Sequence, residues 1–392
     1  MAALDSEALE LHSRSRGKIE VKSKVQVASR KDLSLSYTPG VAAVSSAIAG
    51  NGELAYKYTI KQNSVAVVSD GSAVLGMGNV GPLAAIPVME GKCVLFSKLA
   101  GVDAFPICLD VHTPDEIVAV VKAIAPVFGG INLEDIAAPK CFEIEERLKR
   151  ELGIPVMHDD QHATAVVVLA GFMNALKVVG RSKEDIIVIV SGAGAAGIAT
   201  AKMLLAFSVK DVILVDTSGA IYHGRKDGMN PEKERIASIT NRGVRKGQLS
   251  DVIVGADVFI GVSKACVLNA AMVQSMSPNP IIFAMANPVP EIMPDEAKSA
   301  GAAVVATGRS DFPNQINNSL AFPGIFRGAL DCRASEINEE MKLAAAYALA
   351  SLVPSPSPEK IVPDPLDPAI VPAISKAVSS AARHSGVAGK VA

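Results

Sequence analysis

Residues 186–216, IIVIVSGAGAAGIATAKMLLAFSVKDVILVD, decide the fold class of this chain. An apolar, mostly β-branched run leads into a glycine-rich turn, a helical pattern follows the turn, and a second apolar run ends on Asp216. This order predicts a βαβ unit that binds a dinucleotide, because the helix N-terminus offers unpaired N–H groups and a positive dipole end to a pyrophosphate. Asp216 follows Gly192 at close to the expected spacing of about 20 residues.

The three glycines of this turn have separate expected roles. Gly192 permits the tight turn, Gly194 lets the pyrophosphate approach the backbone, and Gly197 lets the helix pack closely on the strand. A strand–helix turn without a ligand is the competing interpretation, and the flanking strands and the acidic residue argue against it. The residues expected to bind the cofactor here are Gly192, Gly194, Ala195, Ala196, Gly197 and Asp216.

The same glycine pattern occurs a second time, at residues 76–81, in a different context. Pro82 follows it at once, Pro87 interrupts the next turn, and no strand ends on an acidic residue at the right distance. This earlier copy is interpreted as a glycine-rich loop of the first domain that lines the substrate cleft.

The identity of the cofactor depends on the charge around Asp216. An aspartate at this position accepts hydrogen bonds from both ribose hydroxyls and repels a 2′-phosphate, which favours NAD. Arg225, Lys226 and Lys233 follow closely enough in the sequence to compensate this charge. The sequence therefore favours NAD and leaves NADP open.

The rest of the chain alternates strand and helix patterns over 392 residues, which is typical of two α/β domains with parallel sheets. Strands are predicted at 65–68, 94–96, 105–109, 154–157, 186–190, 212–216, 258–260, 281–284 and 304–307. Helices are predicted at 114–124, 141–152, 164–178 and 198–207, and in a tail from residue 335 that contains the Pro-rich segment 353–372 and a last helix at 373–383. We expect an N-terminal substrate and metal domain at 1–160. A Rossmann-like, doubly wound domain with a helical C-terminal extension is expected at 161–392.

Composition argues against several classes of partner. The formal net charge is −2, there is no Trp, and aromatic residues make up 4%, so binding of nucleic acid is not expected. No signal peptide is recognisable, and the longest apolar runs fall short of the ~18 residues of a membrane helix. Five scattered cysteines indicate reduced thiols in a cytoplasmic protein. The mean hydropathy of +0.32 is high for a monomer and favours a homodimer.

Two acidic pairs, Glu134-Asp135 and Asp159-Asp160, are candidates for a metal site. Each pair alone is compatible with helix capping. Together, before a nucleotide-binding domain, they match an all-oxygen site for Mg²⁺ or Mn²⁺. His158 and His162 have the spacing of a zinc hydrolase, but aspartate replaces the glutamate base and such an activity would leave the βαβ unit unexplained.

Ordered motifs along nearly the whole chain resemble a malic enzyme of the shorter type found in bacteria and archaea. The matching segments are SYTPGVA at 36–42, SDGSAVLGMGNVGPLAAIPVMEGKCVLF at 69–96, INLEDIAAP at 131–139, HDDQHATA at 158–165, SGAGAAGIA at 191–199, FAMANPVPE at 283–291 and INNSLAFPGIFRGAL at 316–330. Malic enzymes oxidise L-malate with NAD or NADP and decarboxylate the resulting oxaloacetate to pyruvate and CO₂. The resemblance also implies decarboxylation of added oxaloacetate.

The resemblance implies a role for individual residues. Tyr37 matches the general acid that protonates C3 of enolpyruvate, and Lys92 matches the general base, with Lys98 as a less well-spaced rival. A base role requires the pKa of Lys92 to be lowered, which a metal cation and burial would achieve. Asp159 matches a carboxylate that tunes this lysine. The implied metal ligands are Glu134, Asp135 and Asp160, and the implied substrate or nicotinamide contacts are Asn287 and Asn318.

One departure leaves the partner of a malate carboxylate open. Longer malic enzymes carry an arginine just before the V-L-G-M-G segment, where this chain has Ser72 and Ala73. Another basic residue or backbone amides must replace it. Two alternatives to a malic enzyme use only the βαβ unit: a metal-independent dehydrogenase of another hydroxy or amino acid, and a non-catalytic NAD-binding protein.

Overall fold

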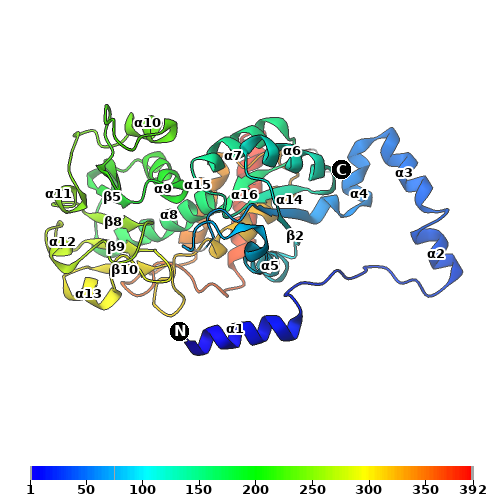
Figure 1. Cartoon of the computed structure of the whole chain (residues 1–392), viewed down its shortest axis with the longest axis horizontal. Helices are drawn as coiled ribbons and strands as arrows, with labels where there is room; N and C mark the ends of the chain where they lie inside the picture. The colour runs from blue at the N-terminus through cyan, green and yellow to red at the C-terminus, as the bar shows by residue number, and fades with distance from the viewer. Residues whose placement is uncertain (1, 75, 390–392) are drawn as a thin grey trace.

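Two parallel sheets form the body of the protein in the computed structural model, which describes residues 2–74 and 76–389 (Figure 1). The first sheet has the order β2-β1-β3-β4, from β1 (Ser64–Ser69), β2 (Asp103–Cys108), β3 (Gly130–Leu133) and β4 (Val156–His158). The second has the order β10-β9-β8-β5-β6-β7, from β5 (Ile187–Ser191), β6 (Asp211–Asp216), β7 (Gly219–Ala220), β8 (Val258–Gly261), β9 (Ile281–Ala284) and β10 (Val304–Thr307). Only the short β7 pairs antiparallel among these strands. This confirms the predicted α/β class, with a Rossmann-like second sheet.

Helices surround both sheets and extend beyond them. Those before and around the first sheet are α1 (Ala2–Ser15), α2 (Arg30–Ser36), α3 (Val41–Gly50), α4 (Ala55–Tyr58), α5 (Gly81–Ala100), α6 (Pro114–Ile124) and α7 (Lys140–Glu151). The next are α8 (Asp159–Val179), α9 (Ala195–Ala206), α10 (Pro231–Ala237), α11 (Leu249–Val252), α12 (Ala270–Gln274) and α13 (Pro294–Ser299). The tail holds the 3₁₀ turn η5 (Asn318–Leu320) and helices α14 (Phe322–Asp331), α15 (Glu339–Ser351) and α16 (Ile370–His384).

Helix α8 joins the two sheets and contributes most of its length to a core that both share. Its residues pack in one apolar cluster with side chains of β1 and α5 on one side and of β5, β6 and β8 on the other. By length and composition this helix could cross a membrane, but 72% of its apolar window is buried inside the protein. It is longer than the apolar run recognised in the sequence, and its burial marks it as a core helix.

Two local predictions were wrong for identifiable reasons. The run at 94–96, predicted as a strand, lies inside α5, whose buried positions Met89, Cys93, Phe96 and Ala100 recur at helical spacing. The strand β3 was missed because its four residues begin with glycine and contain Asn132, which breaks the apolar run.

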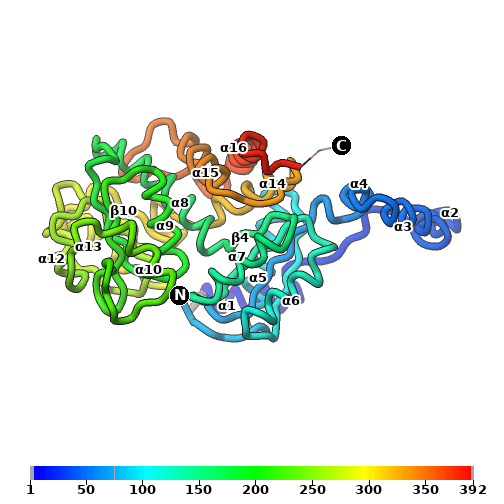
Figure 2. Tube along the Cα trace, turned by 90° about the horizontal axis from the view of Figure 1, so that it is seen from above, coloured from blue at the N-terminus to red at the C-terminus, as the bar shows by residue number. Residues whose placement is uncertain are grey.

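The segment that carries α2 and α3 projects away from the body as an arm. Both views place it at the end of the molecule opposite the second sheet (Figures 1 and 2). Neither helix has a buried residue, although α3 is rich in alanine and valine. An apolar helix without a covered face indicates an interaction surface.

Candidate active site

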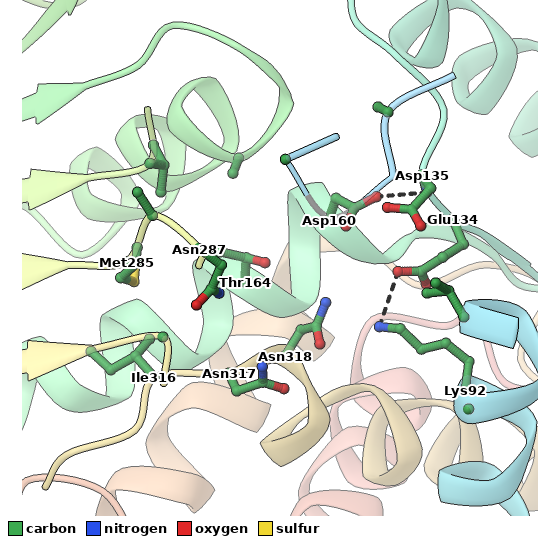
Figure 3. A pocket seen from close by; sticks show the side chains of 18 of the residues that line it. Lys92, Glu134, Asp135, Asp160, Thr164, Met285, Asn287, Ile316, Asn317 and Asn318 are labelled. Atoms are coloured by element: carbon green, nitrogen blue, oxygen red, sulfur yellow. Dashed lines mark hydrogen bonds and ion pairs between the residues drawn. The ribbon is translucent and has the colours of Figure 1, made fainter. Parts of the chain in front are cut away.

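A cavity of about 680 Å³ lies between the two domains and takes its walls from both (Figure 3). The first domain contributes the glycine loop at Gly76, the pocket face of α5, and the acidic residues at the ends of β3 and β4. The second contributes Ala196 of the nucleotide fingerprint and the loops after β8, β9 and β10. The cavity therefore joins the predicted metal site to the predicted nucleotide site.

The acidic residues meet because β3 and β4 are neighbouring parallel strands whose carboxyl ends share one edge. Glu134 follows β3, and Asp159 and Asp160 begin α8 directly after β4. Oxygen atoms of these three carboxylates lie within 4.8 Å of one another. The backbone N–H of Asp135 donates to Asp160 Oδ2 at 2.9 Å, which ties the two predicted pairs together.

This cluster has the electrostatics of a cation site. Burial raises the pKa of Glu134 although Lys92 opposes the shift, and burial followed by the charge of Asp160 raises the pKa of Asp135 to about 8. Asp135 Oδ2 and Asp159 Oδ1 are buried and have no hydrogen-bond partner among the described residues. Orphaned carboxylate oxygens at the edge of a cavity fit a hard divalent cation. Asp159, which was not a predicted ligand, joins Glu134 and Asp160 in the cluster, whereas the predicted ligand Asp135 is not among the described carboxylates that lie within 4.8 Å of one another.

Lys92 reaches the acidic cluster from α5. Its Nζ lies 3.0 Å from Glu134 Oε1 (Figure 3). It also pairs with Asp159 and lies 4.4 Å from the centre of the Phe322 ring. Burial lowers the pKa of Lys92, but the carboxylates of Asp159 and Glu134 outweigh it and raise the pKa above its ordinary value. The expected lowering of the pKa of Lys92 depends on a cation in the cluster, which would compete with the lysine for these carboxylates, so it stays a prediction. Lys98, its rival, lies outside this cavity.

The glycine fingerprint has the backbone geometry that the motif requires. Gly192 has φ +110°, and a Cβ there would lie 2.5 Å from Val262 O. A Cβ on Gly197 would overlap the carbonyl oxygen of Gly192, whereas a Cβ on Gly194 would meet nothing within 4 Å. The first and third glycines thus close the turn, and the second leaves open space at the N-terminus of α9, where Ala195 and Ala196 begin the helix.

A second cavity of about 540 Å³ continues from this turn. Gly192, Gly194, Asp216 and Lys233 line it, and Ser263 lines both cavities, so the two adjoin. The second cavity lies at the carboxyl ends of β5 and β6, which is where dinucleotides bind in folds of this type.

Asp216 ends β6 in this second cavity and is already paired with cations. Arg225 Nη1 donates to Asp216 Oδ1 at 2.8 Å, Arg225 Nη2 binds Oδ2, and Lys233 Nζ lies 2.7 Å from Oδ2. Burial opposes ionisation, but these hydrogen bonds lower the pKa of Asp216 to about 2. Two of the three basic residues suggested by the sequence thus compensate its charge, and Lys226 has no contact with Asp216 in the described structure.

The two predicted asparagines line the first cavity. Asn287 is closely enclosed by two glycines. A Cβ on Gly76 would lie 2.8 Å from the backbone carbonyl oxygen of Asn287, and a Cβ on Gly308 would lie 2.8 Å from its Nδ2. Asn318 begins η5, and the side chain of Asn317 caps that turn by accepting from the N–H of Ser319. Gly76 of the earlier glycine copy lines this cavity, whereas Gly78 and Gly81 are not among its lining residues.

Some lining residues were missed and others lie elsewhere. Lys18, Thr164, Ser263 and Asn317 line the cavity without having been singled out, and only Asn317 had a signal, as the neighbour of a predicted residue. Tyr37 does not line it: this side chain is 66% exposed on the arm, so one chain does not bring the predicted acid to Lys92.

The two histidines do not share a helix face. His158 ends β4, whereas His162 lies inside α8. His162 Nε2 lies 2.9 Å from Glu145 Oε2, and its Nδ1 lies 3.0 Å from Lys342 Nζ. This imidazole is engaged in a buried network that ties α7, α8 and α15 together, which leaves no paired histidines for zinc.

Family models match both halves of the chain: "Malic enzyme, N-terminal domain" over residues 16–149 and "Malic enzyme, NAD binding domain" over residues 161–383. The chain belongs to the malic enzyme family. It is 59% identical over 388 residues to the bifunctional malic/malolactic enzyme of Bacillus subtilis, covering 98% of this chain and 95% of that protein. It is 60% identical over 376 residues to the NAD-dependent malic enzyme of Geobacillus stearothermophilus, covering 95% of this chain and 78% of the relative.

A solved structure shows the same fold. The NAD-dependent malic enzyme of Thermotoga maritima superposes with a TM-score of 0.93 at 50% identity, covering 95% of this malic enzyme and 98% of that chain. Other relatives are named NADP-dependent malic enzyme. The family uses either nicotinamide cofactor for the oxidative decarboxylation of malate.

Proposed function

We propose that this enzyme converts L-malate to pyruvate and CO₂ with reduction of NAD, or less efficiently NADP, and that it requires Mg²⁺ or Mn²⁺. One observation carries the proposal: a single cavity is lined by the acidic cluster and Lys92 from the first domain and by Ala196 at the nucleotide fingerprint from the second. We place the boundary between these domains at residue 160.

Glu134, Asp135 and Asp160 would hold the cation, with Asp159 beside them. When bound, a divalent cation supplies Lewis acidity at the C2 oxygen and the C1 carboxylate of malate. A nicotinamide held at the glycine turn would supply the hydride acceptor for C2. Lys92, as the neutral amine, takes the proton of the C2 hydroxyl.

Other side chains position these groups. Asp159 orients Lys92 and stabilises its protonated form, as the buried ion pair indicates. The amides of Asn287 and Asn318 orient the substrate and the nicotinamide from the opposite wall (Figure 3). Departure of the C4 carboxylate as CO₂ leaves enolpyruvate, which needs a proton at C3. Tyr37 is our candidate for that donor.

We propose that the enzyme is a homodimer in which the arm of one subunit reaches the other. Its apolar side chains are exposed in the single chain: Leu33 by 49%, Leu35 by 66% and Tyr37 by 66%. A second copy would bury these residues and would bring a tyrosine to a cavity that its own chain does not supply.

Complementation tests the shared site. Tyr37→Phe and Lys92→Ala proteins are each purified, mixed, unfolded and refolded together. A mixed dimer retains one intact site if the tyrosine comes from the partner subunit, so activity returns. A mixture as inactive as its components would contradict this arrangement, and a monomer mass near 40.6 kDa by light scattering would exclude the dimer.

Steady-state assays test the reaction itself. The purified enzyme is supplied with malate, Mn²⁺ and either NAD or NADP, and formation of reduced cofactor and pyruvate is measured with and without EDTA. We expect turnover that EDTA abolishes and Mn²⁺ restores. Absence of reduced cofactor under all conditions would overturn the proposal, and activity undiminished by EDTA would favour a metal-independent dehydrogenase.

A further inference from the structure

The catalytic cavity contains a second lysine, Lys18, which comes from a segment remote in sequence from the other catalytic groups. It lies in the stretch between α1 and α2 and lines the same cavity as Lys92, Glu134 and Asp160. Lys92 is paired with two carboxylates, and among the described residues that line this cavity Lys18 is the other cation that can bind an anionic substrate.

Specific contacts fix Lys18 on α5. Its backbone N–H donates to Glu90 Oε2 at 3.1 Å, and its Nζ donates to the carbonyl oxygen of Pro87 at 2.6 Å. Gly17 has φ +97°, and a Cβ there would lie 2.9 Å from Glu90 Oε1, so glycine allows the chain to approach. The ammonium group has three donors, and the carbonyl of Pro87 uses one of them.

Gly91 makes room for this ammonium group. A Cβ at position 91 would lie 3.3 Å from Lys18 Nζ, closer than an ordinary contact between a side chain and its neighbour. Glycine in the interior of a helix is destabilising relative to alanine, and α5 contains it directly before Lys92. The absence of a side chain at Gly91 therefore makes room for Lys18 Nζ against α5, one residue before Lys92 in the sequence.

We propose that Lys18 binds the C4 carboxylate of malate and so replaces the arginine that Ser72 and Ala73 do not supply. The inference rests on the proposed function, in which the cation takes the C1 carboxylate and the C2 oxygen. The C4 carboxylate is then the charged group of the substrate without a partner, and burying an unpaired carboxylate is costly.

The charge balance of the cavity supports this assignment. Glu134, Asp135, Asp159 and Asp160 crowd the metal end of the cavity with negative charge, which a divalent cation would offset only in part. Lys18 adds a positive charge to the wall of this cavity and so reduces the repulsion that an entering dicarboxylate meets. A cation at the departing carboxylate stabilises the bound substrate more than the transition state of its loss, so it contributes to binding and not to turnover.

Steady-state kinetics of Lys18→Gln with malate, NAD and Mn²⁺ test the proposal. We expect the KM for malate to rise about tenfold, as for loss of a charge-assisted hydrogen bond in a partly exposed site, with kcat changed less than about threefold. Pyruvate lacks the C4 carboxylate, so its inhibition constant against malate should stay unchanged. Lys18→Arg keeps the charge and should restore most of the affinity.

Lys22→Gln is the matched control, because Lys22 is exposed on the same segment and does not line the catalytic cavity. Calorimetric binding of NAD to each variant shows that the nucleotide site has folded. An unchanged KM for malate in Lys18→Gln, or a parallel rise in the inhibition constant of pyruvate, would overturn the assignment while leaving the proposed function intact. A wild-type enzyme without turnover on malate would instead overturn the proposed function.

Discussion

Replacement of Lys233 by glutamine should shift cofactor use toward NAD. Lys233 Nζ lies 2.7 Å from Asp216 Oδ2 in the cavity that continues from the glycine turn. Arg225 also pairs with Asp216, so this subsite carries one net positive charge. A 2′-phosphate would bind Lys233 and not Arg225. Arg225 is buried and already donates to the carbonyl oxygen of Gly219.

The magnitude follows from the exposure of the lysine. Loss of a hydrogen bond to a charged group costs about 1.5–3 kcal/mol, and a side chain that is 17% exposed belongs at the low end of this range. About 1.5 kcal/mol corresponds to roughly a tenfold fall in kcat/KM for NADP. NAD presents a 2′-hydroxyl that Asp216 accepts, so kcat/KM for NAD should stay within about twofold of wild type or rise.

The assay is kcat/KM for each cofactor at saturating malate and Mn²⁺, in wild type, Lys233→Gln and Lys226→Gln. Lys226 is exposed near the same loop without contacting Asp216, so its variant should keep the wild-type ratio of NAD to NADP. Equal falls in kcat/KM with both cofactors would refute the reasoning. They would show that Lys233 supports the fold of the subsite and does not distinguish a 2′-phosphate from a 2′-hydroxyl.

Four further substitutions test the site. Gly197→Ala should lower the free energy of unfolding by about 1–3 kcal/mol in urea titrations, because its Cβ overlaps the carbonyl of Gly192, whereas Gly194→Ala should leave stability unchanged and weaken NAD binding in calorimetry. Lys92→Ala should lower kcat by about 10²–10⁴-fold while the Kd of NAD is retained, and a kcat near that of wild type would exclude it as the base. Asp135→Asn should raise the Mn²⁺ concentration for half-maximal activity at least about tenfold, and an unchanged Mn²⁺ requirement would remove Asp135 from the ligand set.

Elements built from local patterns could be predicted from the sequence. The strands β5 and β6 with α9 between them follow from a short apolar run, a glycine turn and a helical pattern that agree with one another. The arm could not be predicted in this way, because α2 and α3 bury no residue and therefore show no amphipathic stripe.

The predictable part of the site consists of its acidic residues. Glu134 and Asp160 were recognisable as members of two acidic pairs before the nucleotide-binding unit, although the strand β3 that positions Glu134 was missed. The ion pair of Lys92 with Asp159 joins positions 67 residues apart. The hydrogen bond from the backbone N–H of Lys18 to Glu90, which holds Lys18 at the cavity, joins positions 72 residues apart. Such contacts arise from tertiary packing, and the local periodicity of the sequence does not predict them.

Helix α8 connects the chemistry of the cavity to the stability of the whole chain. Its first two residues, Asp159 and Asp160, place carboxylates at the positive end of its dipole, and the rest of the helix fills the core beneath both sheets. Crowded carboxylates oppose folding when no cation binds them, because burial raises the pKa of Glu134 and of Asp159. A cation bound there as proposed would relieve that repulsion at the point where the two domains meet, and would thereby stabilise the folded arrangement around Lys92.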